Sequence, residues 1–466
     1  MYHKITPLFV NKLKKALGED AVFTETETIN AHAQDHTEKL FFPPEVVVKP
    51  KNTEGVSKVM KLCYKHRIPI TVQGARSGLT GGALPVLGGV ALSMERLDKI
   101  LHIDAQNFQV TVEPAIITEH LQNVLKEQSL FYPPDPAGRG LSYIGGNIGT
   151  NAGGPRCVKY GVTRDYVLNL EIVLANGDIM WTGANTIKNS TGYNLTQLIV
   201  GSEGTLAVVT KIVLKLLPYP AFNLLMLAPF YSAEEACAAV AAIFQAGITP
   251  STLEFMERDA LDYAIRYVGS APFTINPEHG GQLLIELDGN DMDALHKDCE
   301  KIAEVISRYR TDDILFADSD AQKNELWKLR RNMGNAMRQL SYAWVSEDTV
   351  VPRAKLPELL RGVKGIGEKM NFKSLCFGHV GDGNLHINII SDVPVTVEWR
   401  KEMDKAKRAI FELTKSLGGM LSAEHGVGYT QKGFMDVFFA ENHIQILRGI
   451  KKVFDSRGIL NPNKIF

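Results

Sequence analysis

Residues 73–82 read QGARSGLTGG and residues 145–154 read GGNIGTNAGG, and the glycines of the chain concentrate in these two segments. The first directly follows Ile68–Val72, an apolar and β-branched run that is typical of a buried strand. Upstream, Glu45–Val48 predicts another short strand, and Asn52 can cap the helix that separates the two. The sequence around the first segment therefore predicts a β-α-β unit that ends in a glycine loop.

Loops of glycine mixed with serine, threonine and asparagine let backbone N–H groups converge on phosphate oxygens, because no Cβ atom blocks the approach. Neither segment has the G-x-G-x-x-G spacing, and the chain has no G-x-x-x-x-G-K-[ST] motif, which disfavours ordinary NAD binding and P-loop hydrolysis. Flexible turns are the alternative for either segment alone. Two such segments in one β/α region favour a charged diphosphate cofactor such as FAD.

The composition is that of a globular protein with two or three domains, since 45% of the 466 residues are hydrophobic and 22% are charged. The 51 Lys and Arg balance 52 Asp and Glu, so the basic surplus typical of a nucleic-acid binder is missing. No apolar run reaches the 18 residues of a membrane span. Five scattered cysteines and an N-terminus without a signal-like apolar centre lead us to expect a cytoplasmic chain.

A domain boundary is expected near residue 220, where the strand-like run Leu206–Leu217 ends in a proline-rich stretch. Beyond it, strand-like and helical segments alternate without long glycine-rich loops, which favours an α+β domain with helices on one face of a sheet. We expect a cofactor-binding domain over 1–220, a substrate domain over 221–420, and a C-terminal segment, 421–466, that returns to the first domain.

Two histidines flank a short turn late in the chain. If Gly381–Asn384 is a four-residue hairpin loop, His379 lies opposite His386, with Cβ atoms about 4.5–5.5 Å apart, close enough to share a metal ion. Glu424 and His425 occupy a segment of small residues, and Glu424 could add an oxygen ligand and leave open positions, as in a catalytic metal site. The alternative is that the histidines are ordinary polar residues and Glu424 caps a helix.

The glycine segments, together with neighbouring motifs, resemble the FAD domain of the vanillyl-alcohol-oxidase-type flavoproteins. These motifs are Pro134-Asp135, Asn151-Ala152-Gly153-Gly154, Lys159-Tyr160-Gly161 and Gly201-Ser202-Glu203-Gly204-Thr205-Leu206. With the histidine motifs added, the chain from about residue 40 onward resembles the FAD-linked D-2-hydroxy-acid dehydrogenases, which act on D-lactate, glycolate or D-2-hydroxyglutarate. The resemblance implies an α+β protein with a two-lobed FAD-binding domain and an α+β cap domain built on an antiparallel sheet.

The resemblance also implies which residues hold the cofactor. Members of this family that bind FAD covalently carry a histidine in the first glycine loop. Residues 73–89 contain no histidine, so we expect FAD to be bound non-covalently. The expected FAD-binding residues are Gly74, Ala75, Arg76, Ser77, Gly78, Leu79, Thr80, Gly81, Gly82, Pro134, Asp135, Gly145, Gly146, Gly149, Thr150, Asn151, Gly153, Gly154, Gly161, Glu203, Val209 and Asn463.

In the family's pattern, His379, His386 and Glu424 correspond to metal ligands and His425 to the general base. Zinc is the default ion for such nitrogen and oxygen ligands, with manganese as the alternative. Arg330 corresponds to a residue that pairs with the substrate carboxylate, although an arginine on a helix is usually a solvated charge.

Three further positions bear on the substrate. Asn388 corresponds to a substrate contact. The D-2-hydroxyglutarate branch has a lysine at the position of Ser346 and a threonine at that of Gly334. Both differences argue against a substrate that carries a second carboxylate.

The expected function is oxidation of a small D-2-hydroxy acid, of the D-lactate or glycolate type, by hydride transfer to FAD; the alternative substrate is D-2-hydroxyglutarate. Two other classes stay open from the residues alone: a metallohydrolase whose glycine loops merely turn, and a flavin-binding electron carrier. The sequence does not identify the electron acceptor, so an electron-transfer flavoprotein, a quinone and a cytochrome all stay open, and a homodimer is one open oligomeric state.

Overall fold

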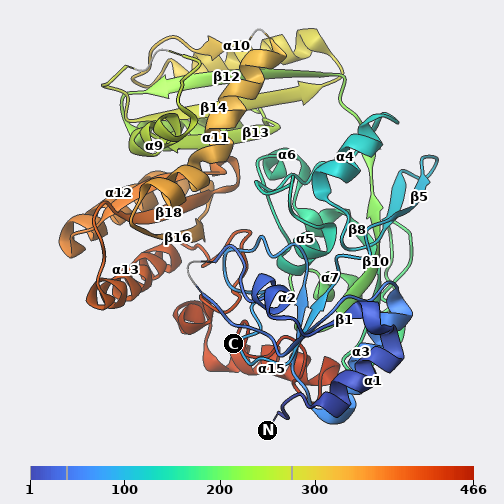
Figure 1. The fold of residues 1–466 in the computed structure, drawn as a ribbon. Coiled ribbons are helices and arrows are strands. Elements are labelled where there is room, and N and C mark those ends of the chain that lie inside the picture. The colour runs from blue at the N-terminus through green and yellow to red at the C-terminus, as the bar shows by residue number, and fades with distance from the viewer. Residues whose placement is uncertain (1, 38–39, 274–275, 318) are drawn as a thin grey trace. The chain divides into compact units, whose positions relative to one another are not determined.

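The structure is a computed structural model that describes residues 2–37, 40–273, 276–317 and 319–466. It has two units (Figure 1): unit 1 consists of Met1–Gly153, Gly161–Tyr219 and Glu424–Phe466, and unit 2 of Gly154–Tyr160 and Pro220–Ala423. Residues 154–160, which we expected in the first domain, belong to unit 2. Lys159 Nζ donates to the carbonyl of Asp288 (2.6 Å), and the Tyr160 hydroxyl donates to the carboxylate of the same residue (2.8 Å).

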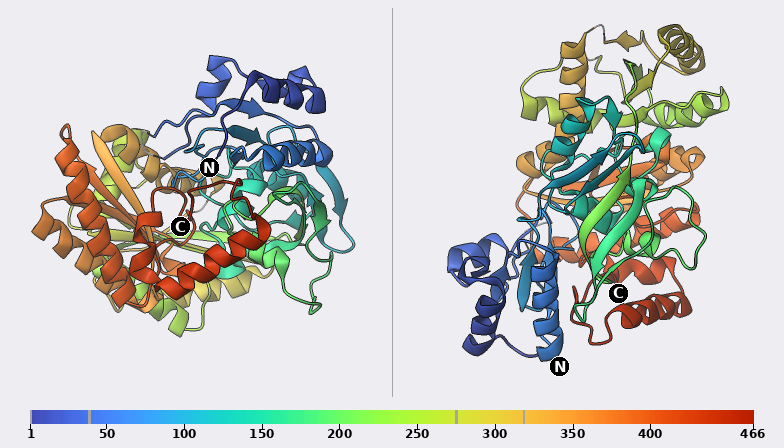
Figure 2. Two further views of the ribbon diagram at one scale, coloured as in Figure 1. Left: turned by 90° about the horizontal axis from the view of Figure 1, so that it is seen from below. Right: turned by 90° about the vertical axis from the view of Figure 1, so that its right-hand side faces the viewer.

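Unit 1 begins with a four-stranded sheet that contains the predicted β-α-β unit. In sheet order its strands are β1 (Val22–Phe23), β2 (Val46–Val48), β4 (Val90–Ser93) and β3 (Ile70–Gln73). Strands β2 and β3 run parallel to β4. The crossover helix α3 (Thr53–His66) starts where predicted, because the Asn52 side chain accepts the Gly55 N–H (2.9 Å). Helix α1 (Pro7–Leu17) lies beside α3 (Figures 1 and 2).

The second sheet of unit 1 is antiparallel and five-stranded. In sheet order its strands are β5 (Ile100–Asp104), β6 (Gln109–Val112), β10 (Val208–Lys215), β8 (Val167–Val173) and β9 (Ile179–Trp181). A short pair joins β7 (Leu130–Phe131) to β11 (Leu217–Pro218). The other described helices of this unit are α2 (Thr26–Ala31), α4 (Thr118–Lys126), α5 (Ile144–Thr150), α7 (Leu195–Ile199), α14 (Met435–Phe438) and α15 (Glu441–Phe454).

The second glycine segment is not the loop that we expected, because most of it forms α5. The Gly145 N–H donates to the carbonyl of Pro114 (2.8 Å), and a Cβ atom at Gly145 would lie 2.6 Å from Pro114 Cβ. The helix ends at Asn151, which adopts a left-handed conformation with φ +54°. Close packing of backbone on backbone therefore overrides the low helix propensity of glycine at this position.

Unit 2 is built on a seven-stranded sheet in which every pairing is antiparallel. In sheet order its strands are β15 (Leu315–Phe316), β12 (Phe222–Phe230), β14 (Gly281–Gly289), β13 (Thr252–Glu257), β17 (Lys373–Gly378), β18 (Asn384–Ser391) and β16 (Ala343–Val350). Its described helices are α6 (Cys157–Tyr160), α8 (Ala233–Gln245), α9 (Arg258–Val268), α10 (Met292–Ile306), α11 (Asp320–Leu340), α12 (Leu356–Met370) and α13 (Val397–Ser416).

Helices cover both faces of this sheet, so the expectation of a single covered face is wrong. Helices α8, α10, α12 and α13 pack on the face that carries Phe255, Ile285 and Ile387. Helices α9 and α11 pack on the other face, where Met256, Leu284 and Phe377 point. The central strands of the sheet are therefore buried on both sides. The alternation of strand-like and helical segments in the sequence does not reveal this. Among the described residues, no helix has both the length and the apolar character needed to cross a bilayer.

The turn between β17 and β18 depends on Gly383, which has φ +82° and whose added Cβ atom would overlap the carbonyl oxygen of Val351. We expect Gly383→Ala to lower the free energy of unfolding by about 2–4 kcal/mol, through backbone strain and overpacking. Gly365→Ala on α12 is the matched control, because a Cβ atom there meets open space; it should be neutral or stabilising by up to about 1 kcal/mol. Chemical denaturation measures the free energy of unfolding of both variants. Equal stabilities would contradict the requirement for glycine at position 383.

Candidate active site

A pocket in unit 1 lies between the first glycine loop and α5. Most of the expected cofactor residues line it: Gly74, Ala75, Arg76, Ser77, Gly78, Leu79, Thr80, Gly82, Gly145, Gly146, Gly149, Thr150, Glu203 and Val209. At Gly78 and Gly146 an added Cβ atom would meet nothing within 4 Å, so space is open directly against these stretches of backbone. A diphosphate can therefore approach the main chain there, and the pocket fits the cofactor that the sequence predicts.

Other expected cofactor residues lie outside the lining: Gly81, Pro134, Asp135, Asn151, Gly153, Gly161 and Asn463, as well as Gly154, which belongs to unit 2. Several of them have local structural roles instead; Gly81 turns the chain at φ +74°, and Asp135 lies 3.8 Å from Arg139. Sequence reasoning missed Ser142, Tyr143, Asn147 and Ser202, which do line the pocket. Their only signal was position, since each lies next to or within a glycine motif.

Glu424 and His425 are part of the wall of the same pocket. The segment that carries them lies against the first glycine loop, because the Tyr429 N–H donates to the carbonyl of Thr80 (2.7 Å). The Thr80 hydroxyl donates in turn to the carbonyl of His425 (3.2 Å). The predicted carboxylate and imidazole thus sit within unit 1 beside the predicted flavin site.

Polar side chains gather on one face of the unit 2 sheet. Asp348 and Phe377 are the direct partners of His386, and Ser346 and Leu375 are the direct partners of Asn388. Directly paired residues point to the same face, so His386 and Asn388 share a face with Asp348 and Ser346.

The expected pairing of His379 with His386 is wrong. Strand β17 ends at Gly378, and the partner of His386 is Phe377. His379 instead precedes a 3₁₀ turn over Val380–Asp382, which takes up more residues than a tight hairpin loop would. The two rings nevertheless come together, with centroids 5.3 Å apart and an interplanar angle of 84°.

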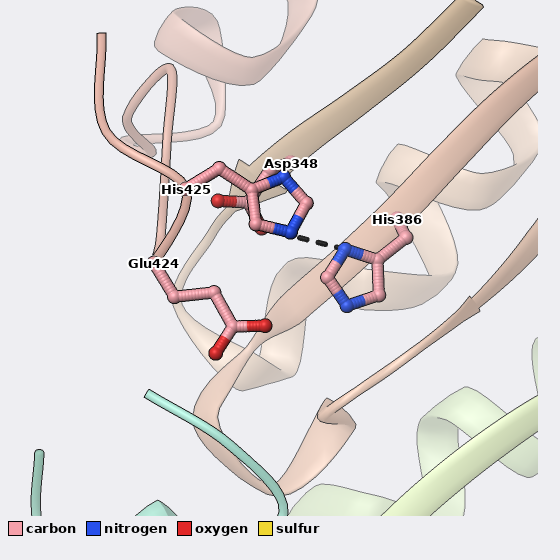
Figure 3. Close-up of side chains that lie close together, drawn as sticks. All are labelled: Asp348, His386, Glu424 and His425. Carbon is pink, nitrogen blue, oxygen red and sulfur yellow. Dashed lines mark ion pairs between the residues drawn. The ribbon is translucent and has the colours of Figure 1, made fainter. Parts of the chain in front are cut away.

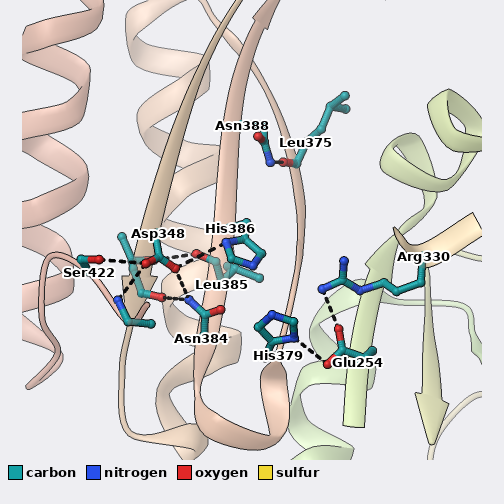
Figure 4. Close-up of polar contacts among 12 residues, drawn as sticks. Glu254, Arg330, Asp348, Leu375, His379, Asn384, Leu385, His386, Asn388 and Ser422 are labelled. Carbon is teal, nitrogen blue, oxygen red and sulfur yellow. Dashed lines mark hydrogen bonds and ion pairs between the residues drawn. The ribbon is translucent and has the colours of Figure 1, made fainter. Parts of the chain in front are cut away.

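Glu254 on β13 connects His379 to Arg330 (Figure 4). The carboxylate of Glu254 is fully buried; its Oε1 lies 2.7 Å from His379 Nδ1, and its Oε2 lies 2.6 Å from Arg330 Nη2. Burial by itself would raise the pKa of Glu254, but the Arg330 and His379 charges outweigh it and lower that pKa. Glu254 is therefore the ionised centre of this cluster, a residue that the sequence did not single out.

Arg330 on α11 is 5% exposed, so it is not the solvated charge of the alternative interpretation. Its Nη2 is at ion-pair distance from Glu254, and its Nε has no hydrogen-bond partner among the described residues. At this distance the two charged groups form an ion pair. The guanidinium, which also lies 4.9 Å from the Phe377 ring, retains donors that a ligand could use.

Asp348 on β16 is another buried carboxylate of this face, and Figure 3 draws it with His386. Its Oδ1 lies 3.4 Å from His386 Nδ1 and accepts from the Asn384 side chain at 2.8 Å. Its Oδ2 accepts from the Ser422 hydroxyl (2.9 Å) and from the Ala423 N–H (3.0 Å). Asp348 thus anchors the end of unit 2 immediately before Glu424 in the chain.

His379 and His386 both have Nδ1 beside a buried carboxylate, so Nε2 is the ring nitrogen that would face a metal ion. A carboxylate on the opposite ring nitrogen is the usual way in which a protein orients a metal-binding imidazole. The donor chemistry of His379 and His386 therefore fits a divalent metal ion of the zinc or manganese type.

The three positions that we expected to bear on the substrate are on the elements that carry these groups. Ser346 faces Asn388 across the β16–β18 pair, and the Asn388 side chain donates to the carbonyl of Leu375 (3.3 Å). Gly334 lies four residues after Arg330 on α11, hence on the same side of that helix.

Comparison with known proteins gives two matching families. Residues 44–183 match the family described as "FAD binding domain", and residues 219–465 match "FAD linked oxidases, C-terminal domain". By fold, p-cresol methylhydroxylase with bound substrate superposes with a TM-score of 0.82 at 17% identity, covering 100% of this chain and 98% of that one.

Curated relatives share much more of the sequence. D-lactate dehydrogenase of Anaerostipes hadrus is 36% identical, over 100% of this chain and 98% of its own length. Glycolate oxidase subunit GlcD of Bacillus subtilis is 36% identical (93% and 92% covered), and D-2-hydroxyglutarate dehydrogenase of Stutzerimonas stutzeri is 30% identical (99% and 99% covered). With this similarity along its whole length and an FAD domain of the vanillyl-alcohol-oxidase type, the chain belongs to the family of FAD-linked D-2-hydroxy-acid dehydrogenases.

Proposed function

We propose that this protein oxidises a small D-2-hydroxy acid, of the D-lactate or glycolate type, to the 2-oxo acid with the assistance of a divalent metal ion. One observation carries the proposal: a buried carboxylate lies beside Nδ1 of each of two imidazoles, at 2.7 Å from His379 and 3.4 Å from His386, and Arg330 lies at ion-pair distance from the carboxylate beside His379. Such a set suits a small anion with a neighbouring hydroxyl group. The names of the relatives, which include D-lactate dehydrogenase and glycolate oxidase, agree with this choice.

The residues that would hold FAD are those of the first glycine loop and α5, where the backbone is open to a diphosphate. When bound, the flavin supplies a hydride acceptor for the substrate C2 hydrogen. The absence of histidine from residues 73–89 supports non-covalent binding.

The residues proposed to hold the metal ion are His379, His386 and Glu424, and such an ion would supply Lewis acidity toward a hydroxyl group. Support for Glu424 comes from the chain itself. Ala423 is hydrogen-bonded to Asp348, the same carboxylate that lies beside His386, and Glu424 is the next residue.

Arg330 would bind the substrate carboxylate through donors that Glu254 leaves unused, with Asn388 as a neighbouring contact. His425 would accept the hydroxyl proton as the C2 hydrogen leaves with its electron pair, so that a carbonyl forms at C2. A positioned imidazole suits this role because its unprotonated ring nitrogen can accept a proton from a hydroxyl group.

His425→Ala tests the proposed base. We expect anaerobic flavin reduction by D-lactate or glycolate to slow by at least about 100-fold, because the proton acceptor is lost, while FAD stays bound with an unchanged visible spectrum. His120→Ala, an exposed position on α4, is the control and should reduce at the wild-type rate. Stopped-flow absorbance gives both rates, and wild-type reduction by the His425 variant would remove it from this role.

His386→Ala tests the metal site independently of turnover. Purified wild-type protein should contain close to one zinc or manganese ion per chain by elemental analysis, and the variant should lose most of it because an imidazole ligand is missing. His296→Ala, exposed on α10, should keep the wild-type content. Equal metal content in all three proteins would end the metal proposal.

Ser346→Lys tests the substrate assignment. A lysine ammonium opposite Asn388 could pair with a distal carboxylate, so we expect the kcat/KM ratio of D-2-hydroxyglutarate to D-lactate to rise by about tenfold. Ser346→Met, of similar length without charge, should not raise it. If wild-type enzyme already prefers D-2-hydroxyglutarate, the substrate assignment is wrong and the alternative holds.

A further inference from the structure

The carboxylate of Glu203 contacts the backbone that follows Glu424 and His425. Its Oε1 accepts the Val427 N–H (2.8 Å), and its Oε2 accepts the Gly428 N–H (2.7 Å). Glu203 is partly exposed as a residue because it lines the pocket, while both of its carboxylate oxygens contact this backbone. Burial raises the pKa of Glu203 to about 7, even though the two N–H groups act in the opposite direction.

The contact is close enough to require glycine. Gly426 has φ +82°, and a Cβ atom there would lie 2.9 Å from the Glu203 carboxylate. Gly428 has φ +53°, and a Cβ atom there would overlap the carbonyl oxygen of Thr80. The segment is thus held between Glu203 and Thr80 with no space for side chains at these two positions.

Glu203 is itself fixed on both sides within unit 1. Its N–H donates to the carbonyl of Gly149 at the end of α5 (2.7 Å), and its carbonyl accepts from the Asn461 side chain (2.7 Å). Its φ of +50° is unusual for a residue with a side chain, and these bonds hold it in that conformation. A rigidly mounted carboxyl group therefore faces two consecutive backbone donors.

We propose that Glu203 is a positioning residue for Glu424 and His425: by accepting two backbone N–H groups, its carboxylate fixes the segment from which these side chains project into the pocket. This rests on the proposed function of Glu424 and His425, and it differs from the role of cofactor ligand that the motif alone suggested. The chemistry is specific to a carboxylate, because a side-chain amide offers only one acceptor and would place an NH₂ group against the second N–H.

Glu203→Gln in the holoenzyme is the test, since it preserves shape and removes only one acceptor. We expect bound FAD to stay within about twofold of wild type, while the rate of flavin reduction by D-lactate per bound FAD falls by about 10- to 100-fold. Hydrogen exchange followed by mass spectrometry should show faster exchange at residues 427–428. Glu203→Asp, which keeps both acceptors, should recover part of the rate and of the protection.

Glu171→Gln is the control for the loss of a buried carboxylate. Glu171 on β8 accepts from Thr53 on α3 and Thr210 on β10, away from the pocket lining, and its variant should keep the wild-type rate per bound FAD. Loss of FAD by Glu203→Gln with an unchanged rate per bound FAD and unchanged exchange would overturn the proposal in favour of a cofactor ligand. If wild-type flavin is reduced by none of D-lactate, glycolate and D-2-hydroxyglutarate, the proposed function fails, and exchange at 427–428 alone decides the role of Glu203.

Discussion

Burial of the Glu254 carboxylate is the constraint that organises the polar cluster of unit 2. An ion without a partner at a fully buried position costs several kcal/mol, so the fold must bring compensating groups to it. Arg330 from α11 and His379 from the turn after β17 meet this requirement from different parts of the chain. The same pairing gives Arg330 a defined orientation. It also leaves only Nε2 of His379 for other contacts, since Nδ1 lies against Glu254. Stability and site geometry therefore depend on one carboxylate.

Unit 1 meets a different constraint, the close approach of backbone segments to one another and to a ligand. Its glycines serve two separate purposes that look the same in sequence. Gly78 and Gly146 leave open space beside the main chain, whereas Gly145 and Gly428 allow one segment to press against another. The first pair leaves space for a cofactor beside the backbone, and the second pair allows the close packing that fixes the segments around the pocket.

The chain passes from unit 2 back into unit 1 between Ala423 and Glu424, and both sides of this junction are held by carboxylates. Asp348 accepts the Ala423 N–H before it, and Glu203 accepts the Val427 and Gly428 N–H groups after it. The two residues proposed as ligand and base lie between these anchors. A short stretch with no regular secondary structure can thus carry chemistry, since its backbone donors are satisfied by groups on rigid elements.

The sequence by itself determined the local elements and the family. The Asn52 cap, the alternation that puts His386 and Asn388 on one strand face, and the glycine motifs all follow from neighbouring residues, and the structure contains them. Only the tertiary structure decided that Phe377 rather than His379 pairs with His386, that the second glycine segment is a helix, and that helices cover both faces of the sheet. It alone revealed Glu254, 125 residues from His379 in sequence, and the partners of Asp348 and Glu203. The reason is physical: the partner of a buried charge is selected by three-dimensional packing, and no local pattern of residues encodes which distant group will be brought to it.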